Sequence, residues 1–322
     1  MNPRPRRMTA RRTATVLCVT ALAAVLICVA GCAAGPASRP DPAAPSARTL
    51  QRAAAVLTSD ATTLRQRWRL FTAQQVLDRR CMRKLGLRYL IMSAGPEPLA
   101  GITTADVLGT GSPAGYGVVP PETGDASPDT PAQDRYVRSL TAAERDRYVT
   151  ALSGPADRVA PLTLPSGTKG SYATGGCTAQ TRARLYGSVR AAFEDILVPQ
   201  DVNALFADHL AHDRHHRAAL DRWQRCMAGN GHPAQTPEAL IQSLRGKADK
   251  GASPATLDRE QRAAATADRR CDAKSGLRAA LAARRAAFLR QQPEATLSRL
   301  EGVWRVRQQA LRRAAWHVSS PR

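Results

Sequence analysis

Four cysteines that lie far apart in the sequence carry its clearest chemistry: Cys81, Cys177, Cys226 and Cys271. Thiols in an oxidising compartment pair as disulfides, whereas thiols grouped at short spacing bind zinc. The closest two, Cys226 and Cys271, are 45 positions apart, and no CxxC pair is present. The spacing favours two disulfides over a zinc site, and four cysteines allow three pairings.

A second candidate for chemistry is a short stretch rich in histidine and aspartate: Asp208, His209, His212, Asp213, His215 and His216. In one continuous helix, His212 and His216 would lie one turn apart, with His209 near His212 on the same face. The set His209, His212 and His216 could then hold a metal ion. No HExxH motif or cysteine ligand accompanies it, so a solvated polar helix face is favoured over a metal site.

Other motifs of catalysis are missing from the sequence. No G-x-S-x-G or S-x-x-K stands in a convincing context, and no pair of carboxylates is marked. The glycines of Gly109-Thr110-Gly111 have no strand before them or helix after them, so they do not form a phosphate loop. The sequence therefore predicts no catalytic residue and no cofactor.

The N-terminus has the pattern of an export signal. Residues 1–12 contain five arginines and no acid, and residues 13–30 are apolar and uncharged. The stretch ends in Val29-Ala30-Gly31-Cys32, which resembles the lipobox of bacterial lipoprotein precursors, where the cysteine thiol receives diacylglycerol before cleavage. The sequence predicts a signal peptide over 1–31 and lipid attachment at Cys32. An uncleaved membrane helix is the alternative, and the apolar run is short for it.

Charge and composition restrict the possible partners. The 322 residues carry a formal charge of +21. Without the five leader arginines, 42 basic residues face 26 acidic ones, which leaves +16 on the predicted mature chain. This excess favours anionic lipid headgroups or cell-wall polymers as partners. Export and an aromatic content of only 4% argue against nucleic acid.

The elements that must position these residues are predicted to be helices. Residues 32–47 are rich in proline, alanine and serine and predict an extended tether. Residues 48–322 are predicted to form a single α-helical domain that begins with a helix ending near Leu85. A long irregular excursion over about 92–175 follows, interrupted by one short helix that Thr141 and Glu144 cap and Gly154 ends.

After the excursion, helical patterns continue to the end of the chain. They predict one helix over about 178–197 and a second that begins at Pro199 and runs to about 228. Thr236-Pro237 and Ser253-Pro254 each open a further helix, and Pro293 should break the last one. No strand-like alternation of useful length is present. The predicted fold is all-α, a bundle of long antiparallel helices with an irregular excursion.

Three of the cysteines share a local frame, Arg-Cys with a glycine five residues after the cysteine. The frames at Cys81 and Cys271 agree at eight of eleven positions. A common way to end or bend a cysteine-bearing helix explains this better than a duplicated hairpin. Cys81 would end the helix before the excursion and Cys177 would begin the helix after it, which favours the pairs Cys81–Cys177 and Cys226–Cys271. Closing each loop with a disulfide would add about 4–5 kcal/mol to the free energy of unfolding.

Several short motifs together resemble a known group of proteins: the lipobox, Arg-Cys-Met with its trailing glycine, Gly175-Gly176-Cys177, Leu185-Tyr186-Gly187, Trp223-Gln224-Arg225-Cys226-Met227 and an Ala-Asp-x-x-Cys at 267–271. The chain resembles an actinobacterial (Streptomyces-like) lipoprotein family of unknown activity over most of residues 65–315. The resemblance implies an outward-facing lipoprotein and brings no catalytic residues with it.

These observations predict a lipid-anchored protein on the outer face of the cell membrane. We expect a non-enzymatic binding or accessory module of the envelope. The alternatives are an enzyme acting on cell-wall material and a metal-binding protein that uses the histidine stretch. We further expect the arginines of the C-terminal helices to face solvent and anionic surfaces: Arg262, Arg269, Arg270, Arg284, Arg285, Arg290, Arg312 and Arg313.

Overall fold

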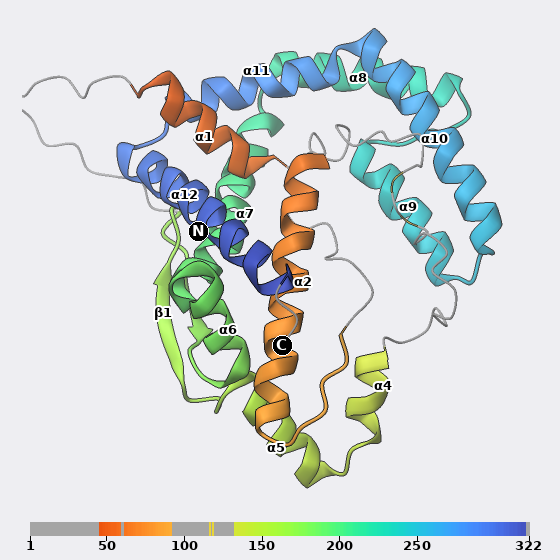
Figure 1. The fold of residues 1–322 in the computed structure, drawn as a ribbon. Coiled ribbons are helices and arrows are strands. Elements are labelled where there is room, and N and C mark those ends of the chain that lie inside the picture. The colour runs from red at the N-terminus through yellow and green to blue at the C-terminus, as the bar shows by residue number, and fades with distance from the viewer. Residues whose placement is uncertain (1–44, 59–60, 92–115, 117, 119–131, 320–322) are drawn as a thin grey trace, which may run out of the picture. The chain divides into compact units, whose positions relative to one another are not determined.

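The computed structural model describes residues 45–58, 61–91, 116, 118 and 132–319 (Figure 1). The predicted signal peptide, Cys32 and nearly all of the tether lie outside these residues. In the described part, no helix combines the length and apolar character needed to cross a membrane.

The predicted all-α class is confirmed, because helices form most of the described residues and their only strands make one two-stranded sheet. The helices are α1 (Ala47–Leu57), α2 (Ala61–Lys84), α4 (Ala132–Ser139), α5 (Ala142–Ser153), α6 (Gly176–Tyr186), α7 (Val189–Ala211), α8 (Arg214–Gly229), α9 (Pro237–Asp249), α10 (Pro254–Ser275), α11 (Leu277–Arg290) and α12 (Glu294–Ser319). The strands are β1 (Val159–Thr163) and β2 (Lys169–Ala173).

Most predicted helix starts are confirmed by their caps. The Thr141 hydroxyl accepts the backbone N–H of Glu144, whose carboxylate accepts the N–H of Thr141 in return. Thr236 and Ser253 cap α9 and α10, and each is followed by proline at the first helical position. Pro293 separates α11 from α12, as expected.

Several predicted helices have wrong boundaries. The helix predicted over about 178–197 is divided at Gly187 between α6 and α7, and the one predicted from Ser253 to Pro293 is divided at Gly276 between α10 and α11. The pattern before Leu85 forms two helices, because the backbone turns extended at Thr58 and the buried Asn203 amide donates to the carbonyl of Leu57, the last residue of α1. Pro199 does not begin a helix but lies buried inside α7, which runs unbroken from Val189 to Ala211.

The proline inside α7 removes one helical hydrogen bond, and a distant arginine replaces it. Without an N–H, Pro199 leaves the carbonyl oxygen of Asp195 without its helical donor. The Nη2 of Arg307 on α12 donates to this oxygen at 3.2 Å, and its Nε donates to the Asp195 carboxylate at 2.7 Å. Both side chains are almost fully buried, at 2% and 3% exposure. The packing of α12 on α7 therefore replaces the hydrogen bond that Pro199 cannot donate.

The described residues bury three apolar clusters within a unit that spans 44–322. The largest joins α1 and the six helices from α7 to α12 around Trp223 and Phe206. A second joins α2, α6, α7 and α12 around Leu70 and Leu185. The third packs Met82, Tyr148 and Cys177 where α2, α5 and α6 meet. Because α12 contributes to the first two, it connects the larger part of the core.

The excursion 92–175 is more ordered than expected in its second half. The predicted short helix is present as α5, but α4 precedes it and an antiparallel hairpin follows it. The absence of strands was therefore a wrong prediction. Each strand buries essentially one side chain, Leu162 or Tyr172, so no alternation is visible, and Pro161 sits where prolines are tolerated, in an edge strand. Residues 92–115, 117 and 119–131 lie outside the described part.

Three glycines allow α5 and α6 to approach closely. Gly154 and Gly176 have positive φ, and a Cβ atom on either would overlap the backbone of the other segment. Gly175 also lies against Gly154. The Gly-Gly pair before Cys177 is thus required by the packing that sets the start of α6.

Candidate functional site

Both predicted disulfides are confirmed. Cys81 on α2 is bonded to Cys177 on α6, with Cα atoms 5.7 Å apart, and Cys226 on α8 is bonded to Cys271 on α10, with Cα atoms 5.4 Å apart. They cross-link residues 96 and 45 positions apart. Every cysteine in the described residues is therefore oxidised, and none is a metal ligand.

The shared Arg-Cys frame ends helices, as predicted. The glycines five residues after the three cysteines, Gly86, Gly231 and Gly276, all have positive φ. Gly276 closes α10 by donating its N–H to the Asp272 carbonyl at 2.8 Å. Glycine recurs because a left-handed residue ends a helix at low cost.

A buried carboxylate three residues before Cys81 and Cys271 is a further part of the frame that the sequence did not explain. Asp78 accepts the Thr181 hydroxyl at 2.6 Å. Asp268 accepts the indole N–H of Trp223 at 2.7 Å and the Tyr116 hydroxyl at 2.9 Å. Burial raises the pKa of both carboxyl groups. In each case a donor comes from the helix joined by the disulfide, so these carboxylates hold helices together.

The histidine stretch does not lie on one helix. Asp213 accepts the backbone N–H groups of His215 and His216 and so begins a new helix, α8, directly after α7 ends. His209 packs on the Phe288 ring at 5.7 Å, and His212 closes α7. Burial lowers the pKa of His216. In the described part of the chain, no three histidine, cysteine, aspartate or glutamate residues are grouped to hold a metal ion.

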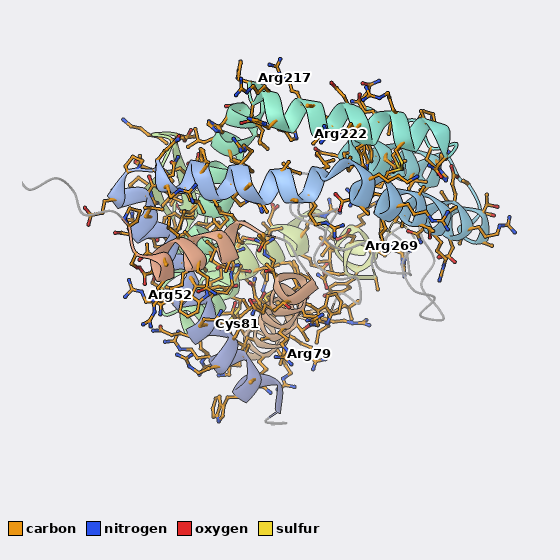
Figure 2. The ribbon with its side chains drawn as sticks, turned by 90° about the horizontal axis from the view of Figure 1, so that it is seen from above. Arg52, Arg79, Cys81, Arg217, Arg222 and Arg269 are labelled. Carbon is orange, nitrogen blue, oxygen red and sulfur yellow. A yellow bond between two sulfur atoms is a disulfide. The ribbon has the colours of Figure 1, made fainter. Side chains whose placement is uncertain are left out.

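Many arginines have structural partners. Four donate to carbonyl groups at or near helix ends, where such donors are scarce and positive charge is favourable: Arg147 at α2, Arg145 at α4, Arg313 at α6 and Arg222 at α10. Figure 2 shows labelled arginines on α1, α2, α8 and α10. Part of the excess charge thus stabilises helices.

The expectation that the C-terminal arginines face solvent is only half correct. Four of the eight are exposed: Arg262, Arg270, Arg290 and Arg312. Arg269, Arg284 and Arg313 are half-buried, and Arg285 is buried with its guanidinium over the Phe206 ring. The apolar stripe of a helix leaves its flanks near neighbouring helices, where an arginine stem packs and its head finds an acceptor.

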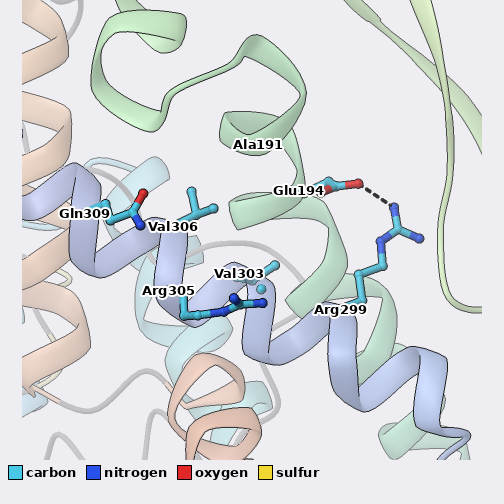
Figure 3. A pocket seen from close by; sticks show the side chains of 8 residues that line it. Ala191, Glu194, Arg299, Val303, Arg305, Val306 and Gln309 are labelled. Atoms are coloured by element: carbon cyan, nitrogen blue, oxygen red, sulfur yellow. Dashed lines mark hydrogen bonds and ion pairs between the residues drawn. The ribbon is translucent and has the colours of Figure 1, made fainter.

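The strongest candidate for a binding site is a groove between α7 and α12 with a volume of about 350 Å³ (Figure 3). Its lining is Ala191, Glu194, Arg299, Gly302, Val303, Arg305, Val306 and Gln309. On α12 these positions repeat every three or four residues and share one face. The valines and Ala191 are apolar, Gly302 adds no side chain, and the charged groups form the rim.

An ion pair holds one side of this groove. The Nη2 of Arg299 donates to Glu194 Oε1 at 3.0 Å, and Arg190 donates to the same oxygen from one turn earlier in α7. The Nη1 of Arg299 donates to the carbonyl of Thr163 at the end of β1. Figure 3 shows this pair spanning the two helices. The unexpected hairpin therefore helps to orient a groove residue.

The remaining polar groups of the groove have free donors. Arg305 and Gln309 are exposed, and neither forms a hydrogen bond or ion pair with the described residues. They are one helical turn apart on α12. The groove thus combines an apolar floor, an arginine held by an ion pair and two polar side chains without a hydrogen-bond partner among the described residues.

A second hollow of about 410 Å³ lies beside the Cys226–Cys271 disulfide, between the end of α8 and the face of α10. Asn230 places its Nδ2 3.7 Å from both sulfur atoms. Arg262, at its edge, is bonded to Asp258 at 2.7 Å. Its lining also includes His232 and the exposed Arg270.

The sequence did not indicate the groove residues. Glu194 and Arg299 are 105 positions apart, and only helix packing brings them together. The one hint in the sequence was Gly302, because a glycine inside a strong helical pattern often has a packing or functional reason. Comparisons with protein-family models, with curated proteins and with solved structures found no match for this chain.

Proposed function

We propose that this chain is an exported lipoprotein, anchored through a lipid on Cys32 to the outer face of the cell membrane. Its helical domain acts there as a non-enzymatic binding or accessory module of the envelope. Anionic lipid headgroups or wall polymers are its partners, drawn by the charge of +16 on the predicted mature chain.

The observation that carries this proposal is the pair of disulfides. Reducing systems keep cytosolic thiols free, whereas exported proteins retain disulfides. Both bonds join helices of the core, and each lies next to a buried carboxylate that bonds to the partner helix. A fold built around two such cross-links suits an oxidising compartment, and the signal-like residues 1–31 supply the route to it.

The arrangement of polar groups favours binding over catalysis. The buried carboxylates Asp78, Asp195 and Asp268 are each bonded to donors of neighbouring helices, so they have structural roles. The α7–α12 groove offers guanidinium and amide groups, which recognise anions, and no nucleophile beside a base.

Metabolic labelling with a fatty-acid analogue tests the anchor. Wild-type protein should incorporate the label, and Cys32→Ser should abolish it. Cys28→Ser, which changes a cysteine inside the predicted leader, is the matched control and should keep the label. Absence of label on the wild type, or label retained by Cys32→Ser, would contradict the assignment.

Protease treatment of intact cells tests the side of the membrane. An outward-facing domain should be degraded, while a cytoplasmic marker protein stays intact. Alkylation of free thiols in cells, followed by non-reducing peptide mapping, should recover Cys81–Cys177 and Cys226–Cys271 as disulfides. Protection from protease together with four alkylated cysteines would place the domain in the cytoplasm and refute the proposal.

A further inference from the structure

The α7–α12 groove has the capacity of a small-ligand site. Its volume of about 350 Å³ falls at the lower end of the range for such sites, roughly 300–1,000 Å³. A bare inorganic anion would leave much of it empty. A ligand that fills the groove would need an organic body to cover Val303, Val306 and Ala191.

The space in the groove depends on Gly302. Gly302 lies inside α12, and a Cβ atom built at this position would meet no heavy atom within 4 Å beyond the neighbouring backbone of its own helix. A helix interior normally favours any other residue except proline over glycine. The missing side chain leaves open the centre of the groove lining, between Arg299 and Arg305.

The charge of the lining selects an anion. The lining contains two guanidinium groups, Arg299 and Arg305, and one carboxylate, Glu194, so its formal charge is +1. Arg305 also lies in the field of Glu301, but that carboxylate is bonded to Arg52. Arg299 is oriented by Glu194 and by the Thr163 carbonyl, while Arg305 and Gln309 offer free N–H donors. Guanidinium groups match the oxygens of phosphate, and an amide can donate to a phosphate or accept from a hydroxyl.

We propose that the groove formed by Arg299, Gly302, Val303, Arg305, Val306 and Gln309 binds a phosphodiester monoanion that carries a small polyol. This inference rests on the proposed binding function at the membrane, and it names the ligand class of that function. Such a group is available as a lipid headgroup or as a free glycerophosphodiester. Arg305 binds the phosphate, Gln309 binds a hydroxyl, and the polyol carbons cover the valines.

Calorimetric titration of full-length protein in detergent, with both disulfides intact, tests the proposal. The probe is glycerophosphoglycerol, a monoanionic phosphodiester without acyl chains. Wild type should bind it, and Gly302→Leu should weaken binding by more than about tenfold because the leucine fills the groove. Gly246→Leu is the matched control, since Gly246 also lies inside a helix with open space around it. It should bind as wild type does.

Two charge variants predict opposite changes. Arg305→Gln should weaken binding by roughly tenfold, because it removes a charge-assisted donor. Glu194→Gln should strengthen binding by about three- to tenfold, because it removes the competing negative charge while keeping an acceptor for Arg299. General damage to the fold does not produce tighter binding, so this variant separates ligand recognition from a structural role.

Vesicles distinguish the two sources of the ligand. Wild type should bind phosphatidylglycerol vesicles better than phosphatidylcholine vesicles, with a loss on Gly302→Leu, if the groove takes a membrane headgroup. Binding of the soluble probe alone assigns the groove to a free phosphodiester. If Gly302→Leu binds the probe as well as wild type does, or if wild type does not bind it, the groove assignment is wrong. Labelling of Cys32 is measured separately, so failure here leaves the anchor intact.

Discussion

Replacing Arg307 by methionine should lower the free energy of unfolding by about 4–6 kcal/mol, one of the largest losses expected for a single residue of this chain. Methionine fills similar space but provides neither charge nor donors. The Asp195 carboxylate loses its 2.7 Å partner at 3% exposure, and the Asp195 carbonyl loses the donor that stands in for the missing N–H of Pro199.

The loss has two parts that other variants separate. Breaking a buried ion pair by removing one partner costs about 3–5 kcal/mol. Replacing both charges, with Asp195→Leu and Arg307→Met together, should recover most of that, because two apolar residues can occupy the space of a buried pair. The orphaned backbone carbonyl remains and costs about 1–3 kcal/mol.

Pro199→Ala should then recover this remainder. In the Arg307→Met background, alanine supplies the N–H that the carbonyl at 195 lacks. In wild type the same carbonyl already accepts a hydrogen bond from Arg307, so Pro199→Ala should raise the free energy of unfolding by less than about 1 kcal/mol. Equilibrium unfolding in urea, followed by far-ultraviolet circular dichroism, measures all four proteins of this cycle. If Pro199→Ala has the same effect in both backgrounds, Arg307 does not stand in for the missing backbone N–H at position 199.

Three further predictions concern stability. Gly176→Ala should cost at least about 3 kcal/mol because its Cβ would overlap the α5 end, whereas Gly86→Ala, also at positive φ but in open space, should cost about 1 kcal/mol; similar thermal melts would contradict the close approach. Burial raises the pKa of Asp268 above its ordinary value of 3.8. In the pH window between that value and the raised pKa, the folded protein keeps the proton on Asp268 while the unfolded chain has lost it, so the free energy of unfolding falls as pH rises. Wild type should therefore lose stability relative to Asp268→Asn as pH rises through that window, and parallel pH curves would argue against it. Alanine pairs replacing either disulfide should each cost about 4–5 kcal/mol in non-reducing urea unfolding, and a loss below 1 kcal/mol would show that the bond does not constrain the unfolded chain.

Local signals in the sequence were sufficient for much of the fold. A cap acts within one helical turn, so Thr141, Thr236 and Ser253 could be recognised from their neighbours alone. The glycines after the cysteines end helices for the same local reason. Once the ends were known, the cysteines at those ends allowed the disulfide pairing to be chosen, because bonded residues must lie where helices meet.

Other features depend on partners that no local pattern specifies. Inside α7, the donor that Pro199 lacks is supplied by Arg307, more than a hundred positions later. The strands of the hairpin bury too few side chains to alternate, and their position is set by packing such as that of Tyr172 on Phe193, at 5.0 Å between ring centroids. The histidines do not share the predicted helix face because the Asp213 carboxylate accepts backbone N–H groups and begins a new helix, α8.

The predicted export signal and the α7–α12 groove differ in the same way: the first is read from local sequence and the second depends on tertiary packing. Export and lipid attachment are predictions from residue types and their order along 1–32 alone, and these residues lie outside the described part. The groove between Glu194 and Arg299 exists only once α12 packs on α7, because hydrogen bonds reach about 3 Å and only the folded core brings these side chains that close. The sequence predicted the helical class, the capped helix starts and the cross-links; tertiary packing decided where Pro199 and the histidines lie and which arginines are paired.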